Sequence, residues 1–252
     1  MKATRLKEME QYILSKKFAT IDELCHEFNI HPNTARADIK ELVEKGVAQK
    51  RYGGVASVSS NQLVSYDKRQ KYNESAKKII GCTAAEILEE DDVIFVDAGT
   101  TTPMLFKSAH ELPEHITVIT NNLDVISWVV GNKNYPIFVL PGKVNKSLNA
   151  VASIETIESL KTYNIKKAFI GTRGISAKGE LTSTSGIDAK LKSTAIEISD
   201  SVILMADSNK LNQTTLFNFS SLANIDYWVC ERISNEVNQL AEEMNVKIMC
   251  TI

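Results

Sequence analysis

Short apolar runs alternate with helical segments over the last two thirds of the chain, and this alternation constrains the fold more than any other feature. Turn-forming residues such as Gly, Pro, Asn and Asp separate the runs from the helical segments. The pattern predicts an α/β domain in which helices cover the faces of a mostly parallel sheet. The predicted strands span Val93–Val96, Ile116–Thr120, Ile137–Leu140, Ala168–Gly171, Val202–Ala206 and Tyr227–Val229.

The first sixty residues have a different pattern, of three short helices. Apolar residues at helical spacing predict a first helix over residues 4–16. The sequence from Thr20 to Glu23 has the form of a capping box, which predicts the start of a second helix. A third helix is expected from Pro32 to Lys45, ending at Gly46. Two short helices joined by a tight turn predict a helix-turn-helix.

A hairpin is expected directly after the third helix. Val47–Tyr52 and Val55–Val58 are predicted strands, and Gly53-Gly54 is a turn signal between them. A hairpin in this place is typical of the wing of a winged helix-turn-helix. A helix with Asn, Arg and Lys on its outer face is suited to the major groove of DNA, where Arg reads guanine and Asn reads adenine. The candidate DNA-binding residues are Asn33, Thr34, Arg36 and Lys40, with Lys50 and Arg51 of the wing as phosphate contacts.

The alternative is that this outer face is only solvated, as in any small three-helix unit. Charge gives weak support to DNA binding. The whole chain has a formal net charge of −2, but its first sixty residues carry ten Lys and Arg against eight Asp and Glu. A zinc site or a disulfide framework is not expected, because the four cysteines have no CxxC spacing. We therefore expect neither a metal nor a cofactor. We expect a cytoplasmic location, since no apolar stretch is typical of a secretion signal or a membrane span.

A polar stretch separates the two patterns. Residues 57–65 are rich in Ser, Asn and Gln and have little periodicity, which favours a domain boundary. The predicted organisation is a winged helix-turn-helix domain over residues 1–58, a linker over 59–75 and an α/β domain over 76–252.

Polar motifs follow several predicted strands of the α/β domain. Ligands of open parallel sheets bind beyond the carboxyl ends of the strands. After the first strand, backbone N–H groups and three threonine hydroxyls at a predicted helix start are suited to a phosphate. Side-chain amides suit sugar hydroxyl groups, and three cations (Lys143, Arg173 and Lys210) could neutralise a phosphate or pair with Asp97. The alternative is that these residues only cap helices. The candidate ligand-binding residues are Asp97, Gly99, Thr100, Thr101, Thr102, Thr120, Asn121, Asn122, Gly142, Lys143, Arg173, Gly174, Asp207 and Lys210.

The sequence resembles the DeoR family of transcriptional regulators over nearly its whole length. The family's recognition helix reads V-S-x-x-T-I-R-R-D-L, and the corresponding run here is Ile30–Ile39. Ala37 takes the place of one of the paired arginines, whereas Arg36 matches the other. The wing motif H-G-G-A corresponds to Tyr52-Gly53-Gly54-Val55.

The family's effector domain resembles ribose-5-phosphate isomerase, and its motifs match at the predicted strand ends. D-x-G-T-T matches Asp97–Thr101, T-N-S matches at Thr120 and Asn121, and D-S-S-K matches at Asp207, Ser208 and Lys210. Gly142 matches in the G-G motif, and Gly171 and Gly174 match in G-A-D-G. Two cations depart from these motifs, since Lys143 replaces a glycine and Arg173 replaces an acidic residue. The resemblance adds Asp188 as an effector-site residue and Lys192 as the lysine of the same helix.

This resemblance implies a homodimeric or homotetrameric transcriptional regulator. It is expected to be a repressor of a carbohydrate utilisation operon whose binding to double-stranded operator DNA is modulated by a phosphorylated sugar. The alternative is a sugar-phosphate isomerase with a DNA-binding module. Aldose isomerisation needs a positioned carboxylate base, and Arg173 stands where the family's acidic residue is expected. We therefore predict that the protein is not an enzyme and has no catalytic residue.

Overall fold

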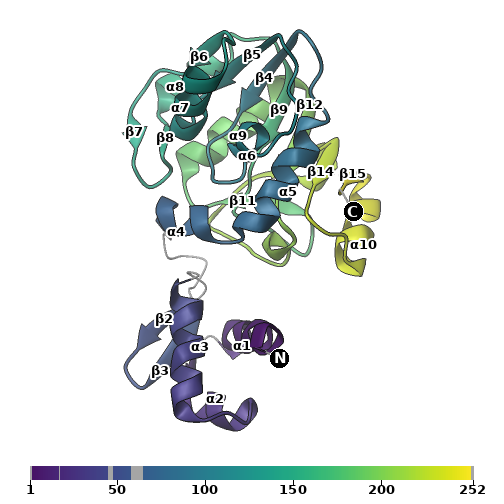
Figure 1. The fold of residues 1–252 in the computed structure, drawn as a ribbon. Coiled ribbons are helices and arrows are strands. Elements are labelled where there is room, and N and C mark those ends of the chain that lie inside the picture. The colour runs from purple at the N-terminus through teal and green to yellow at the C-terminus, as the bar shows by residue number, and fades with distance from the viewer. Residues whose placement is uncertain (1, 17, 45–47, 58–64, 251–252) are drawn as a thin grey trace. The chain divides into compact units, whose positions relative to one another are not determined.

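The computed structural model describes all residues except 1, 17, 45–47, 58–64 and 251–252. The chain divides into two compact units, Met1–Tyr72 and Asn73–Ile252 (Figure 1). The predicted end of the third helix at Lys45 and Gly46, the predicted strand residues Val47 and Val58, and most of the first half of the predicted linker lie outside the described residues.

The first unit is a small helical domain with a three-stranded antiparallel sheet in the order β1-β3-β2. Apolar side chains from the helices and strands form one core, which includes Met9, Ile13 and Leu42. The unit's elements are α1 (Lys2–Lys16), β1 (Phe18–Thr20), α2 (Ile21–Glu27), α3 (Pro32–Glu44), β2 (Ala48–Arg51), β3 (Gly54–Ser57) and α4 (Tyr66–Lys71).

Two features of this unit differ from the sequence prediction. The strand β1 pairs with the wing through Ala19 and Val55, so the predicted hairpin is part of a larger sheet. In addition, α4 is a helix within the segment predicted as a linker. The capping box is present: the amide of Glu23 donates to Thr20 Oγ1 (3.1 Å), and the amide of Thr20 donates to Glu23 Oε2 (2.7 Å).

The second unit is built on a seven-stranded parallel sheet in the order β15-β14-β12-β9-β4-β5-β6. This confirms the predicted fold class. The sequence analysis did not predict β15, a three-residue strand at the sheet edge. The strands are β4 (Asp92–Val96), β5 (Ile116–Thr120), β6 (Ile137–Val139), β9 (Ile165–Ile170), β12 (Ser199–Met205), β14 (Tyr227–Val229) and β15 (Lys247–Met249).

Helices cover both faces of this sheet (Figure 1). Successive residues of a strand point to opposite faces, and Ile94 and Phe95 accordingly belong to two separate hydrophobic clusters. Ile203 and Leu204 divide between the same two clusters. Burial on both faces explains why the inner strands β4, β9 and β12 end in apolar runs. The helices are α5 (Glu74–Ala85), α6 (Met104–Lys107), α7 (Leu123–Asn132), α8 (Ile154–Leu160), α9 (Gly186–Ile198) and α10 (Asn235–Met244).

Smaller elements connect the strand ends to the helices. A second antiparallel sheet in the order β10-β11-β13 lies between β9 and α9 in the sequence and is completed after β12. The sequence analysis did not predict it. These elements are β7 (Val144–Asn145), β8 (Ala150–Val151), β10 (Gly174–Ile175), β11 (Glu180–Ser183), β13 (Phe217–Ser221) and the 3-10 turns η1 (Ser208–Lys210) and η2 (Leu222–Asn224).

Candidate functional site

The carboxyl ends of the central strands bring several of the predicted residues to one edge of the sheet. In the register, Val96 of β4 pairs with Thr120 of β5 and with Phe169 of β9, so these strands end at the same level. Leu204 of β12 pairs with Ile170 of β9, which continues the same edge to Asp207. The polar groups that follow these strands therefore lie at neighbouring positions.

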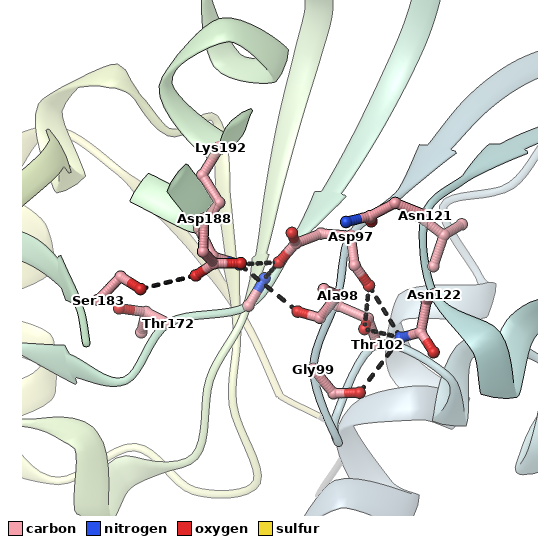
Figure 2. A network of polar contacts seen from close by, with 12 residues as sticks. Asp97, Ala98, Gly99, Thr102, Asn121, Asn122, Thr172, Ser183, Asp188 and Lys192 are labelled. Carbon is pink, nitrogen blue, oxygen red and sulfur yellow. Dashed lines mark hydrogen bonds and ion pairs between the residues drawn. The ribbon is translucent and has the colours of Figure 1, made fainter. Parts of the chain in front are cut away.

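A buried group of charges occupies this edge, and we call Asp97, Ser183, Asp188 and Lys192 the Asp97 cluster (Figure 2). Lys192 Nζ forms an ion pair with Asp97 Oδ2 and lies 3.7 Å from Asp188 Oδ1. Ser183 Oγ donates to Asp188 Oδ2 at 2.6 Å. The four-residue spacing of Asp188 and Lys192 puts them on one face of α9, which directs both toward the end of β4.

The environment of Asp97 perturbs its titration. Burial raises the pKa of Asp97, the positive charge of Lys192 opposes this effect, and the nearby charge of Asp188 adds to it. The resulting pKa is about 6. The amide of Gly171 donates to Asp97 Oδ2 at 3.0 Å. Its other oxygen, Oδ1, is buried and has no hydrogen-bond partner among the described residues. Asp97 thus presents one unsatisfied acceptor.

The loop that follows Asp97 is fixed by hydrogen bonds to its backbone. Asn122 Nδ2 donates to the carbonyls of Asp97 (3.1 Å) and Gly99 (3.2 Å), and Thr102 Oγ1 donates to the carbonyl of Asp97 (2.7 Å). Asn122 also caps α7 by accepting from the amide of Asp124. Thr102 and Asn122 therefore shape the loop rather than present free polar groups.

The helix expected after this loop is short. α6 has four residues and begins at Met104, after a turn. The phosphate site predicted after the first strand relied in part on a helix N-terminus, and the four-residue α6 provides only a short one. Thr100 and Thr101 are buried in the loop.

Two polar side chains at the end of β5 differ in role: Thr120 ties two strands together, and Asn121 has an oxygen without a hydrogen-bond partner among the described residues. Thr120 Oγ1 donates to the carbonyl of Val96 at 2.6 Å, which ties β5 to β4. Asn121 Nδ2 donates to the carbonyl of Val151 at 2.8 Å, whereas Asn121 Oδ1 is buried without a hydrogen-bond partner among the described residues. Like Asp97, Asn121 retains a free acceptor.

Gly142 and Lys143 lie on a separate connection, after β6. Gly142 has a φ of +134°, and a Cβ at this position would lie 2.2 Å from Ser153 Oγ. This close approach is enough to explain why glycine occupies position 142, so the glycine is not evidence of ligand contact. The side chain of Lys143 is exposed. The ion-pair partner of Asp97 is Lys192, so the suggestion that Lys143, Arg173 or Lys210 pairs with Asp97 is wrong.

The turn between β9 and β10 carries Arg173 and Gly174. The amide of Arg173 donates to the carbonyl of Thr182 at 3.0 Å, and its side chain is partly buried. A Cβ on Gly174 would lie 2.4 Å from the carbonyl oxygen of Gln213, so Gly174 permits close packing of two backbone segments.

Asp207 caps η1 at the end of β12. Its Oδ1 accepts from the amide of Asn209 (3.2 Å) and from Asn73 Nδ2 (3.1 Å), while its Oδ2 is buried without a hydrogen-bond partner in the described part of the chain. Lys210 ends η1 and is partly buried. Asn73 was not predicted, because nothing in the sequence indicates its contact with a residue 134 positions away.

The predicted DNA-binding residues lie together on α3 and β2. Asn33, Arg36 and Lys40 are exposed on α3, and Thr34 is partly exposed. Arg36 Nη1 donates to Asn33 Oδ1 at 3.4 Å. The opposite face of α3 is buried, including Asp38, which forms an ion pair with Arg5. Lys50 and Arg51 of β2 are exposed beside the wing turn.

Comparison with known families matches both units. Residues 5–61 match the DeoR-like helix-turn-helix domain, and residues 72–232 match the DeoR C-terminal sensor domain. The chain belongs to the DeoR family. It is a DNA-binding transcriptional regulator, as the sequence resemblance predicted.

Two curated relatives of this DeoR-family regulator match it over most of their length. The HTH-type transcriptional regulator IolR of Bacillus subtilis (strain 168) is 31% identical over 249 residues, which cover 98% of this chain and 99% of that protein. The glycerol-3-phosphate regulon repressor of Escherichia coli (strain K12) is 24% identical over 218 residues, which cover 86% and 85% of the two chains.

Among solved structures, ribose 5-phosphate isomerase A of Methanocaldococcus jannaschii aligns with the DeoR-family chain at a TM-score of 0.40 and 15% identity. The alignment covers 55% of each chain. This likeness concerns the fold alone.

Neither a membrane-spanning helix nor a metal-binding group is present among the described residues. The regulator's helices include none with the length and apolar character to cross a membrane. No group of three or more His, Cys, Asp or Glu side chains within the same residues has an arrangement that could hold a metal ion.

Proposed function

We propose that this DeoR-family protein is a repressor of a carbohydrate utilisation operon, and that a phosphorylated sugar bound at the sheet edge modulates its affinity for the operator. The observation that carries the ligand site is the set of buried, unsatisfied acceptors at neighbouring strand ends: Asp97 Oδ1, Asn121 Oδ1 and Asp207 Oδ2. A buried polar atom without a partner costs free energy. Three of them at one edge support a ligand that supplies the missing donors.

The chemistry of these atoms favours a polyhydroxylated ligand. Carboxylate and amide oxygens accept hydrogen bonds from sugar hydroxyl groups. The hydroxyls of Thr100 and Thr101 and the backbone around Gly99 are suited to a phosphate. The name of the E. coli relative, a glycerol-3-phosphate regulon repressor, agrees with this ligand class.

DNA binding is assigned to the first unit. We propose that α3 enters the major groove, with Arg36 contacting a base and Asn33, Thr34 and Lys40 beside it, while Lys50 and Arg51 contact phosphates. A homodimer or homotetramer would place two such units on operator half-sites. We expect this DNA binding to take place in the cytoplasm, where the operator DNA lies.

Asn73 supplies a physical route from the ligand site to the DNA-binding unit. It is the first residue of the sensor unit and has a left-handed backbone, with φ 50° and ψ 38°. Its side chain binds Asp207, whose other oxygen is one of the unsatisfied acceptors. A ligand that engages Asp207 would alter the contact that holds Asn73, and ligand can shift a conformational equilibrium only through such differential contacts.

The competing function is a sugar-phosphate isomerase. Asp97 is a buried carboxylate with a raised pKa, a property that catalytic acids and bases share. Both curated relatives described above are regulators, which supports a sensor without turnover.

Operator binding in the presence of sugars tests the proposal. The full-length protein is titrated onto DNA from its own promoter, with phosphorylated sugars compared against the same sugars without phosphate. We expect a phosphorylated sugar to shift the apparent Kd, the unphosphorylated sugar to have no effect, and the added sugar to be recovered unchanged. Conversion of an aldose phosphate to a ketose phosphate would support the isomerase, and an operator Kd that no sugar changes would exclude the sensor.

A further inference from the structure

The guanidinium group of Arg173 has no hydrogen bond or ion pair with another described residue, although its side chain is partly buried. Arginine has five N–H donors and stays charged in proteins. Withdrawing such a group from water without an acceptor is costly. The position therefore favours an anionic partner, which the described residues do not supply.

The backbone that carries Arg173 is held on both sides. Thr172 Oγ1 donates to the carbonyls of Gly174 (2.9 Å) and Thr182 (3.1 Å), and the amide of Arg173 donates to Thr182 as well (3.0 Å). On the amino side, the amide of Gly171 is bound to Asp97. Arg173 thus starts from a fixed turn, which reduces the entropy lost when its side chain binds a ligand.

The electrostatic surroundings also favour an anion here. Burial lowers the pKa of Arg173, and the carboxylate of Asp188 opposes this effect. Asp188 does not neutralise Arg173 by contact, because its oxygens are engaged by Ser183 and lie near Lys192. The positive charge is poorly solvated and incompletely balanced.

Thr172, which precedes Arg173 in the chain, and Gly99 of the loop after Asp97 lie on different sides of Asp97 (Figure 2). In Figure 2, Thr172 lies beside Ser183 and Asp188, whereas Gly99 lies beyond Asp97 on the other side. A ligand whose phosphate is held by the loop and whose hydroxyls meet Asp97 would therefore extend toward the turn of Arg173.

We propose that Arg173 binds a second anionic group of the effector, so that this regulator responds to a phosphorylated sugar acid, with a carboxylate at the end opposite the phosphate. Arginine pairs with a carboxylate through two parallel N–H···O bonds. This inference rests on the proposed phosphorylated-sugar function and narrows its ligand class.

Matched pairs of ligands test it directly. Isothermal titration compares phosphorylated aldonates with the corresponding phosphorylated alditols, which differ only in carboxylate against hydroxymethyl: erythronate and erythritol 4-phosphate, ribonate and ribitol 5-phosphate, gluconate and glucitol 6-phosphate. For at least one pair we expect the full-length protein to bind the acid about ten-fold or more tightly, since a hydrogen-bonded charge pair is among the stronger polar contacts.

Substitutions assign this preference to Arg173. Arg173→Gln should bring the affinity ratio of the pair close to one, and Arg173→Lys should restore part of it. Lys178→Gln removes an exposed cation of the sensor unit outside the candidate site and should leave the ratio unchanged. Thermal unfolding followed by circular dichroism establishes that each variant is folded, and the ratio of the unsubstituted protein tests the ligand class even if Arg173→Gln does not fold.

The failure of this inference is distinct from that of the proposed function. Equal affinity for acid and alditol in every pair, or a ratio that persists in Arg173→Gln, would overturn the role of Arg173 while leaving a phosphorylated-sugar sensor intact. If no phosphorylated compound binds, neutral aldose and ketose phosphates included, both the inference and the proposed function are wrong.

Discussion

Asn73 Nδ2 donates a hydrogen bond to Asp207 Oδ1 at 3.1 Å, across 134 positions of the sequence. Asn73 is the residue at which the chain enters the sensor unit, and Asp207 lies two residues after β12, a central strand of its sheet. The contact therefore joins a candidate ligand-binding residue to the start of the sensor unit.

Removal of this contact should weaken the response to ligand. In Asn73→Gly the backbone keeps its left-handed conformation, because glycine adopts positive φ freely, while the side-chain hydrogen bond is lost. We expect the ligand-induced change in operator Kd to fall by about five-fold or more, the lower end of typical allosteric couplings, with ligand still bound.

Asn245→Gly is the matched control, since Asn245 has the same backbone conformation (φ 56°) at the end of α10. Fluorescence anisotropy of labelled operator with and without the sugar phosphate measures both variants. A response in Asn73→Gly equal to that of the unsubstituted protein would contradict the proposed route.

Arg36 and Lys50 should differ in how they affect DNA binding. Arg36→Ala should remove discrimination between operator and unrelated DNA, because a base contact carries sequence information. Lys50→Ala should weaken binding to both DNAs alike and lower the slope of log K against log salt by about 0.9, the value for one lost phosphate contact. Competition binding at several salt concentrations measures both effects, and Lys178→Ala, an exposed lysine of the sensor unit, controls for net charge. Intact specificity in Arg36→Ala would remove the base assignment.

The raised pKa of Asp97 predicts a dependence of stability on pH. Its value of about 6 in the folded protein lies above its ordinary 3.8, so the folded state retains a proton that the unfolded state loses. The free energy of unfolding should therefore decrease as pH rises from about 4 to 6, by no more than about 3 kcal/mol from this group. In Asp97→Asn this contribution is absent, so the Tm of the variant relative to the unsubstituted protein should rise over that range. A constant Tm difference would contradict the assignment.

A second ion pair lies at the amino end of β4, away from the candidate ligand site, and should affect stability but not ligand binding. Lys167 Nζ lies 2.8 Å from Asp92 Oδ2 and donates to the carbonyl of Ile87 (2.8 Å), and the side chain of Asp92 is fully buried. Lys167→Ala leaves a buried carboxylate with less compensation and should lower the free energy of unfolding by about 2 to 4 kcal/mol. Lys166→Ala removes an exposed lysine from the same carboxylate and should cost much less. Denaturant unfolding measures both, and equal losses would contradict this difference.

Local patterns in the sequence were sufficient to predict much of the fold. The capping box at Thr20 and Pro32 at the start of α3 act within one helical turn, so the sequence alone locates α2 and α3. The central strands were predicted because burial on both faces leaves each with a short apolar run, as at Val93–Val96 and Val202–Met205. β1 and β15 have three residues each, too few for a pattern to stand out, and their place depends on pairing with distant strands.

The candidate site was predicted less completely, for a related reason. Polar residues that follow parallel strands share one edge of the sheet. The sequence therefore placed Asp97, Asn121 and Asp207 at one edge, and in the structure the strands that precede them end at the same level. The sequence analysis did not identify Lys192 as the ion-pair partner of Asp97, since 95 positions separate them. It also did not distinguish residues that shape the backbone, such as Asn122 and Gly142, from those with unsatisfied atoms, because only the hydrogen-bond partners separate the two groups.

The ion pair of Arg5 with Asp38 has a consequence for how such a regulator can diversify. Asp38 is anchored from beneath α3, while Asn33, Arg36, Ala37 and Lys40 are exposed on the helix. The four exposed positions, which we propose face the DNA, can therefore be substituted without removing this ion pair. Libraries randomised at these four positions, with Arg5 and Asp38 held constant, would yield regulators that keep the same sensor and address new operators.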